Sequence, residues 1–251
     1  MQSYLVSGLA LVLFFFAANP VFAQPMETKA TIYLWATAVD QELQSGANAD
    51  ASRKTVLENL DFALMGEVTH RNGAWLFGLE GFYAKLGKDG NASFTVNSGE
   101  PATPTDIDAA ASFNTETTIL GGFAGYRLVE TSQFDLYGTA GLRYTRFDTE
   151  LTVDDLTNIQ SYRFTTTENL TDVTAGVRGQ YRFNENWSLP FVADIGTGSS
   201  DLTWQAFAGV NYGWGRNVLT AGWRHMAWEI DGDYLKDVSY DGPLLAYSYR
   251  F

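Results

Sequence analysis

The chain has no cysteine, only two histidines, and 16 basic residues against 29 acidic ones. Without cysteine, the protein has no disulfide, no thiol nucleophile and no thiolate metal ligand. The formal net charge of -13 argues against nucleic acid as a partner, because phosphate contacts need clustered Lys and Arg. We predict no catalytic residues, no cofactor, no metal site and no nucleic-acid interface.

Long hydrophobic runs are also scarce. Leu5 to Ala18 is almost entirely apolar, but it is shorter than the roughly 20 residues that a membrane-spanning helix needs. Asn19-Pro20 ends this run, and Val21-Phe22-Ala23 offers small residues at the positions that a signal peptidase reads. We therefore predict a cleaved signal peptide at residues 1–23 and one mature domain at residues 24–251. The absence of Lys and Arg before the apolar run departs from the usual signal-peptide pattern.

The rest of the chain alternates between apolar and polar residues, which is typical of strands with one apolar face. In residues 172–183, for example, Val173 and Val177 share one face while Arg178 and Arg182 share the other. Ten such strands are predicted, at residues 29–39, 61–71, 75–84, 115–128, 133–144, 172–183, 187–195, 202–214, 218–228 and 243–251. In residues 29–39 and 115–128 either face could be the apolar one.

The connections between these strands fall into two kinds. Four are short turns, at residues 72–73, 129–132, 184–186 and 215–217. Five are mostly longer polar loops, at residues 40–60, 87–114, about 148–163, 198–201 and 231–242. Short turns on one side, long loops on the other and an even strand number are typical of outer-membrane barrels. The predicted fold is an all-β, closed antiparallel up-and-down transmembrane β-barrel of ten strands, with eight as the alternative.

The last predicted strand ends on an aromatic residue. Phe251 is preceded on the same face by Tyr249, Tyr247 and Leu245, which resembles the C-terminal assembly signal of Gram-negative outer-membrane barrels. Strand endings with the same character recur at residues 125–128, 141–144, 180–183, 242–245 and 249–251.

On these motifs, residues 24–251 resemble the small outer-membrane β-barrels of the OmpA-like class. The resemblance implies a monomer in the Gram-negative outer membrane. Its implied partners are outer-membrane lipid and lipopolysaccharide, the barrel-assembly machinery and periplasmic chaperones. The class contains anchors, adhesins, channels and a few enzymes, so it implies no single activity.

The inward phase of the predicted strands carries charges of both signs. These residues are Glu67, Glu80, Asp135, Asp172, Asp194, Arg143, Arg178, Arg182, Arg224 and Arg250. Side chains can fill a barrel this narrow, and buried charges must then pair. We predict a structural or interaction barrel whose lumen is filled by ion-paired side chains. A narrow pore for small solutes or anions is the alternative, and the sequence leaves both open.

The histidines do not indicate an enzyme. His70 lies beside a predicted periplasmic turn, and no Ser follows His225 at the same-face position, as a Ser-His-carboxylate arrangement would require. His225, Lys85 and Arg146 fall on the lipid-facing phase. A cation there costs about 2–4 kcal/mol at mid-bilayer but about 0–1 kcal/mol at the interface. We therefore predict that Lys85 and Arg146 lie at the outer interface and contact lipopolysaccharide phosphates, joined by His225 when it is protonated. The alternative is that both cations extend their charged ends into water without such a contact.

Overall fold

The structure, a computed structural model, describes residues 26–43, 48–51, 60–98, 103–155, 160–231 and 235–251. The predicted signal peptide lies outside these residues. The strands are β1 (Glu27–Trp35), β2 (Ala38–Leu43), β3 (Asn48–Ala51), β4 (Leu60–Asn72), β5 (Trp75–Ser98), β6 (Thr103–Glu130), β7 (Phe134–Asp155), β8 (Gln160–Arg182), β9 (Trp187–Gly198), β10 (Leu202–Trp214), β11 (Asn217–Glu229) and β12 (Leu235–Arg250). The described residues contain no helix of a length and hydropathy that could cross a membrane.

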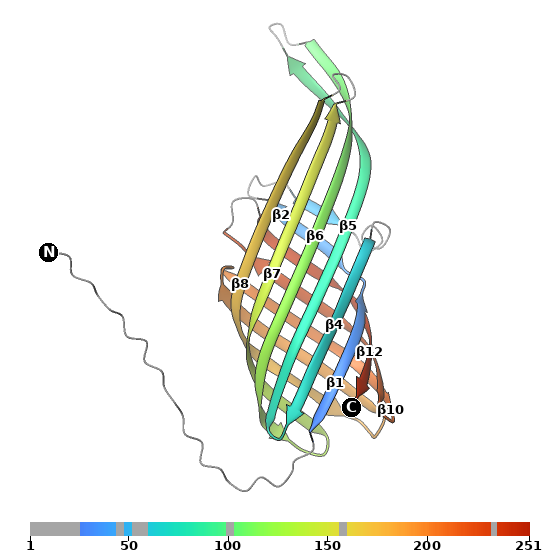
Figure 1. Cartoon of the computed structure of the whole chain (residues 1–251), viewed down its shortest axis with the longest axis vertical. Coiled ribbons are helices and arrows are strands. Elements are labelled where there is room, and N and C mark those ends of the chain that lie inside the picture. Colours follow the sequence, from blue (N-terminus) through green and yellow to red (C-terminus); the bar gives the residue numbers. More distant parts are fainter. Residues whose placement is uncertain (1–25, 44–47, 52–59, 99–102, 156–159, 232–234) are drawn as a thin grey trace, which may run out of the picture.

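These strands form one antiparallel sheet that closes on itself (Figure 1). From β4 to β12 each strand pairs with the next, and β1 pairs with both β4 and β12. After a break at Ala36 and Thr37, the chain continues as β2, which pairs with the same strand, β12, as β1 does. β3 then pairs with β2 to form a small hairpin. β1 and β2 therefore form one strand of the wall. The prediction of a closed up-and-down barrel with ten strands is confirmed, and eight strands is wrong.

The period of two along each strand separates the outer face from the interior. On β1, Ile32 points outward and is 66% exposed, whereas Trp35 points inward and is 4% exposed. On β6, Leu120 is exposed outside and Ile119 is buried inside. The strands at 29–39 and 115–128 had no clear polar face because apolar side chains occupy both sides of them.

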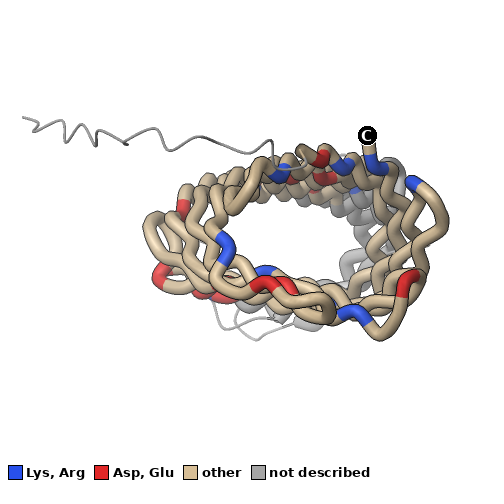
Figure 2. Tube along the Cα trace, turned by 90° about the horizontal axis from the view of Figure 1, so that it is seen from below, with Lys and Arg blue, Asp and Glu red and all other residues tan. Residues whose placement is uncertain are grey.

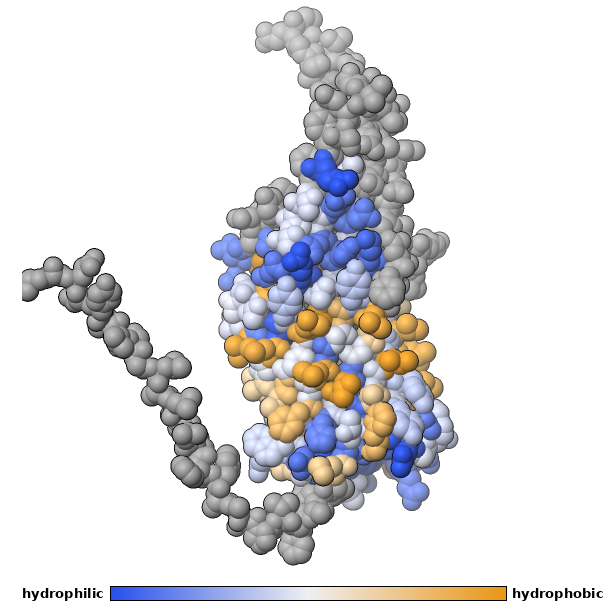
Figure 3. All heavy atoms as spheres, in the orientation of Figure 1, coloured by the Kyte–Doolittle hydropathy of each residue, from blue (hydrophilic) through white to orange (hydrophobic). Residues whose placement is uncertain are grey.

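An exposed apolar band crosses the lower part of the barrel on the face seen in Figure 3, with hydrophilic side chains above it. Its aliphatic members include Leu34, Leu64, Leu79, Leu142, Val173 and Ile195. Aromatic side chains mark its lower edge beside the short turns, with Trp75 edge-on to Tyr126 at 5.1 Å and Trp187 near Tyr212 at 4.9 Å. Such a band with an aromatic girdle is the lipid-facing surface of a transmembrane barrel. The short-turn end, where β12 ends, is its periplasmic end.

The four short turns are confirmed, and Gly73 and Gly215 have the positive φ values that hairpin turns favour, 60° and 58°. The loop at residues 198–201 also lies between strands as predicted. In the other four predicted loops, most of the residues that the structure describes belong to strands instead. β5 and β6 stay paired from Lys88 and Phe113 to Ser98 and Thr103. β7 likewise runs to Asp155, β8 starts at Gln160 and β12 starts at Leu235. The end of β2 and all of β3 fall within residues 40–60.

The physical reason is that a hairpin satisfies its own backbone hydrogen bonds whatever the polarity of its side chains. β5 to β8 can therefore continue as paired strands beyond the membrane band, and they rise above the rest of the barrel in Figure 1. Their Gly-, Ser-, Thr- and Asp-rich sequence favours loops by composition, but sheet context overrides weak strand propensity.

Candidate functional site in the barrel interior

Oppositely charged side chains from non-adjacent strands meet across the interior. Glu67 on β4 lies 2.5 Å from Arg178 on β8, and Glu80 on β5 lies 2.5 Å from Arg224 on β11. Neither pair of strands is adjacent in the sheet, so both ion pairs span the lumen. The Arg178 guanidinium also lies over the ring of Phe123, 4.4 Å from its centre. Closure of the barrel therefore brings these groups together.

Hydrogen bonds join the Glu80–Arg224 ion pair to a third ion pair, between Asp194 and Arg143. In order of contact, this lumen network runs through Tyr33, Glu80, Arg224, Gln205, Asp194, Arg143 and Thr203. The Tyr33 hydroxyl donates to Glu80 at 2.8 Å, and Arg224 donates to the Gln205 amide oxygen at 2.7 Å. Arg143 lies 2.7 Å from Asp194. The carboxylates provide the charge compensation that buried guanidinium groups require.

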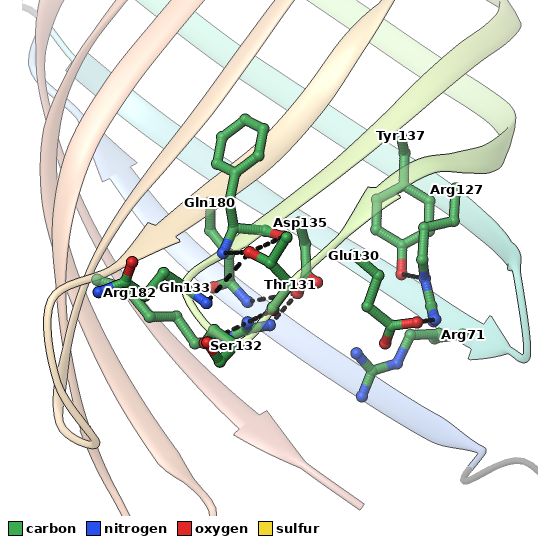
Figure 4. A network of polar contacts seen from close by, with 12 residues as sticks. Arg71, Arg127, Glu130, Thr131, Ser132, Gln133, Asp135, Tyr137, Gln180 and Arg182 are labelled. Carbon is green, nitrogen blue, oxygen red and sulfur yellow. Dashed lines mark hydrogen bonds and ion pairs between the residues drawn. The ribbon is translucent and has the colours of Figure 1, made fainter.

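A second set of polar contacts lies at the periplasmic end, around the turn between β6 and β7 (Figure 4). Arg182 is in close contact with the Asp135 carboxylate, which also accepts a hydrogen bond from the Gln180 amide at 3.3 Å. Arg127 donates to the Tyr137 hydroxyl at 3.1 Å. These contacts tie the β6–β7 turn to the interior faces of β7 and β8.

Two of the ten charged residues predicted for the lumen make no ion pair with any described residue. Asp172 is fully buried; one of its oxygens accepts a hydrogen bond from the Ser200 backbone at 2.9 Å and the other has no described partner. Arg250 lies at the end of β12 and lines a cavity. The other eight form the four pairs Glu67–Arg178, Glu80–Arg224, Asp194–Arg143 and Asp135–Arg182.

Above the lumen network, aromatic side chains pack together inside the barrel, which was not predicted from the sequence. This aromatic layer consists of Trp35, Phe82, Phe147, Trp228 and Tyr240. Tyr240 lies within 6.0–6.5 Å, centre to centre, of the other four rings. Its hydroxyl forms a 2.8 Å hydrogen bond with Thr117. The available signal was a set of bulky side chains on the inward phase of the outer strand halves.

Below the lumen network, a cavity of about 230 Å³ remains. Its lining includes Glu27, Arg71, Asn211, Val218 and Arg250, which lie at or near the periplasmic ends of their strands. The cavity therefore lies on the periplasmic side of the lumen network. Figure 2 looks along the barrel from this end and shows acidic and basic residues distributed around the ring. We call this space the periplasmic cavity.

The predicted lipopolysaccharide contacts lie in two places on the outer wall. Lys85 on β5 pairs with Glu116 on β6 at 2.7 Å, and Arg146 on β7 pairs with Asp148 at 2.5 Å. Because β5, β6 and β7 are consecutive, these residues form one outer polar patch.

His225 lies apart from this patch, on β11. Its Nδ1 atom is 3.3 Å from Asp241, and its ring stacks on Trp204 at 4.5 Å. His70 pairs with the Thr28 hydroxyl at 2.9 Å near the periplasmic end. In the described part of the chain, no three His, Cys, Asp or Glu side chains gather as a metal site would require.

A closed antiparallel barrel with an apolar outer band and a polar interior defines the class of integral outer-membrane barrels. Residues 7–214 match the family described as Outer membrane protein beta-barrel domain, and the chain belongs to this family. The prediction of a small Gram-negative outer-membrane barrel is confirmed. No curated protein matches the chain.

The comparison with solved structures found the following similar proteins, of which the first shares the fold. The outer membrane protease OmpT from Escherichia coli is 11% identical, with 93% of this chain and 99% of that chain covered and a TM-score of 0.52. The translocator domain of autotransporter NalP from Neisseria meningitidis is 16% identical over 91% and 89%, with a TM-score of 0.46. Neisserial surface protein A is 14% identical over 91% and 99%, with a TM-score of 0.38. At these identities, the similarity to OmpT extends to the fold alone.

Proposed function

We propose that this protein is a closed outer-membrane barrel with a structural or interaction role, and that it neither conducts solutes nor catalyses a reaction. The observation that carries the proposal is the aromatic layer, whose members Phe147 and Trp228 are each 1% exposed inside the barrel. The lumen network lies directly below it. Together, an apolar layer and a layer of paired charges fill the interior, as side chains can do in a narrow barrel.

Single-channel recording in planar bilayers tests this proposal. The wild-type protein is expected to be silent after insertion, because the aromatic layer and the lumen network leave no continuous wet path. The double variant Phe147→Ala/Trp228→Ala removes two rings that contact one another at 5.5 Å, and it is expected to give discrete current steps.

The outcome decides between the closed barrel and the narrow pore. The observation that favours a pore is the periplasmic cavity, because its charged lining extends from the periplasmic end of the barrel to Glu80 and Arg224. Discrete steps from the wild-type protein would overturn the closed-barrel proposal. A shift between unheated and heated samples in detergent gels would verify that both proteins are folded before recording.

We also propose that the outer polar patch contacts lipopolysaccharide. Lys85 and Arg146 already donate hydrogen bonds to carboxylates. On binding lipopolysaccharide, they would have to divide their N–H donors between these carboxylates and the phosphates. Lipopolysaccharide is therefore expected to stabilise the wild type more than Lys85→Gln/Arg146→Gln, by a small margin because exposed ion pairs contribute little. Thermal unfolding in detergent, with and without lipopolysaccharide, measures this difference.

The exposed Arg216, in the turn between β10 and β11 at the opposite end, supplies the control variant Arg216→Gln. This variant should respond to lipopolysaccharide as the wild type does. Equal stabilisation of the wild type and the double variant would show that Lys85 and Arg146 are not the contacts.

A further inference from the structure

Two cations lie side by side in the periplasmic cavity. Lys29 on β1 is directly opposite Arg250 on β12 in the strand register, and both side chains line the cavity. Like charges at directly opposed positions of a sheet destabilise it. The next inward pair along these strands, Thr31 and Ser248, is by contrast a hydrogen-bonded pair of hydroxyls at 2.8 Å.

The carboxylates of the cavity form their ion pairs with residues other than these two cations. Nine charged side chains line it, the cations Lys29, Arg71, Arg178, Arg224 and Arg250 and the anions Glu27, Glu67, Glu80 and Asp135. Each of the four anions already lies in an ion pair with an arginine, namely Arg71, Arg178, Arg224 and, from outside the lining, Arg182. Among the described residues, Lys29 and Arg250 therefore form no ion pair. The charges around Lys29 act in both directions: Glu67 and Glu27 attract it, and Arg178 and Arg250 repel it.

The opposite side of the cavity offers apolar contacts. Leu76, Tyr137, Val192 and Phe207 contribute to its lining, and Phe207 also packs against the buried core of the barrel. A volume of about 230 Å³ is below the roughly 300–1,000 Å³ that is typical of pockets for drug-sized ligands. The space therefore suits a small molecule with an anionic end and a short apolar end.

We propose that the periplasmic cavity binds a small organic carboxylate whose anionic group lies between Lys29 and Arg250 and whose apolar part contacts Phe207. The carboxylate would relieve the repulsion between the two cations and accept charge-assisted hydrogen bonds from both. The Thr31 and Ser248 hydroxyls lie one inward position further along the same strands and can complete its hydrogen bonding. The ligand enters from the periplasmic end, so this inference does not depend on whether the barrel conducts.

Titration of the detergent-folded protein with hexanoate tests the proposal, with binding followed by calorimetry. The wild type is expected to bind saturably, and Lys29→Gln/Arg250→Gln is expected to bind at least about tenfold more weakly, since a hydrogen bond to a charged group contributes roughly 1.5–3 kcal/mol. Arg216→Gln, which removes a cation at the same end of the barrel but outside the cavity, should bind as the wild type does. The double variant removes a repulsive pair, so it should fold at least as well as the wild type.

Two further probes separate the anionic group from the apolar part. Hexanamide, which has the same chain without the charge, is expected to bind far more weakly than hexanoate. Inorganic phosphate tests whether charge alone is sufficient, and it should also bind more weakly. Absence of saturable hexanoate binding, equal binding by the double variant, or phosphate binding as tight as hexanoate would overturn the proposal.

Discussion

Replacing Glu80 with Gln is expected to lower the free energy of unfolding by about 3–5 kcal/mol, because it removes the only carboxylate paired with Arg224 among the described residues. The two side chains are only 14% and 7% exposed, so water is a poor replacement for the lost charged partner. Arg224 keeps hydrogen bonds to Tyr33 at 3.2 Å and Gln205 at 2.7 Å, but both are neutral groups. Urea unfolding of the detergent-folded protein measures the change.

The pair Lys85–Glu116 supplies the matched control. Its side chains are 40% and 36% exposed on the outer wall, so Glu116→Gln should cost only about 0–1 kcal/mol. The double variant Glu80→Gln/Arg224→Met removes the orphaned charge and should recover much of the loss. If Glu80→Gln instead costs no more than Glu116→Gln and raises conductance, the lumen is wet and the narrow-pore hypothesis gains support.

The faces of the strands could be predicted from the sequence because a period of two determines them. Glu67, Glu80, Arg178 and Arg224 were placed on the inward face by alternation alone, and the structure gives all four an inward partner. Which carboxylate meets which guanidinium could not be predicted, because it depends on how far the strands are staggered when the barrel closes. We can trace this stagger by moving from Lys29 on β1 to the directly opposed residue on each next strand around the barrel. The trace returns to the β1–β2 wall strand at Gln41 and not at Lys29. A different stagger would bring different side chains together.

Two other features were missed because the sequence signal was ambiguous. The outer parts of β5 and β6 are rich in residues that turns also favour, so composition indicated a loop where the backbone continues as a paired hairpin. The aromatic layer was missed because Trp35 and Trp228 come from strands far apart in the chain. Within one strand, a bulky apolar residue on the inward face is an isolated exception to the polar pattern. Several such residues pack together only when the barrel closes.

The second large effect is expected for Tyr240→Ala, which should lower the free energy of unfolding by about 3–5 kcal/mol, the usual cost of truncating a buried aromatic side chain. Tyr240 is 3% exposed and contacts all four other rings of the aromatic layer, so its removal leaves a cavity at the centre of that layer. It also leaves the buried Thr117 hydroxyl without its 2.8 Å partner. Urea unfolding provides the measurement.

Two companion variants serve as controls. One separates the contribution of the Tyr240 ring to stability from that of its hydroxyl, and the other compares a ring in the interior with a ring on the lipid-facing side. Tyr240→Phe keeps the ring contacts and loses only the hydrogen bond to Thr117, so it should cost about 1–3 kcal/mol. Tyr181→Ala makes the same truncation on the outer face of β8, where the ring is 39% exposed and has one described ring contact, with Phe183 at 5.3 Å. It should destabilise less than Tyr240→Ala, because surrounding lipid or detergent can fill the space that the ring leaves. Equal losses for Tyr181→Ala and Tyr240→Ala would mean that the aromatic layer is not a packed core, and the argument for a closed lumen would then fail.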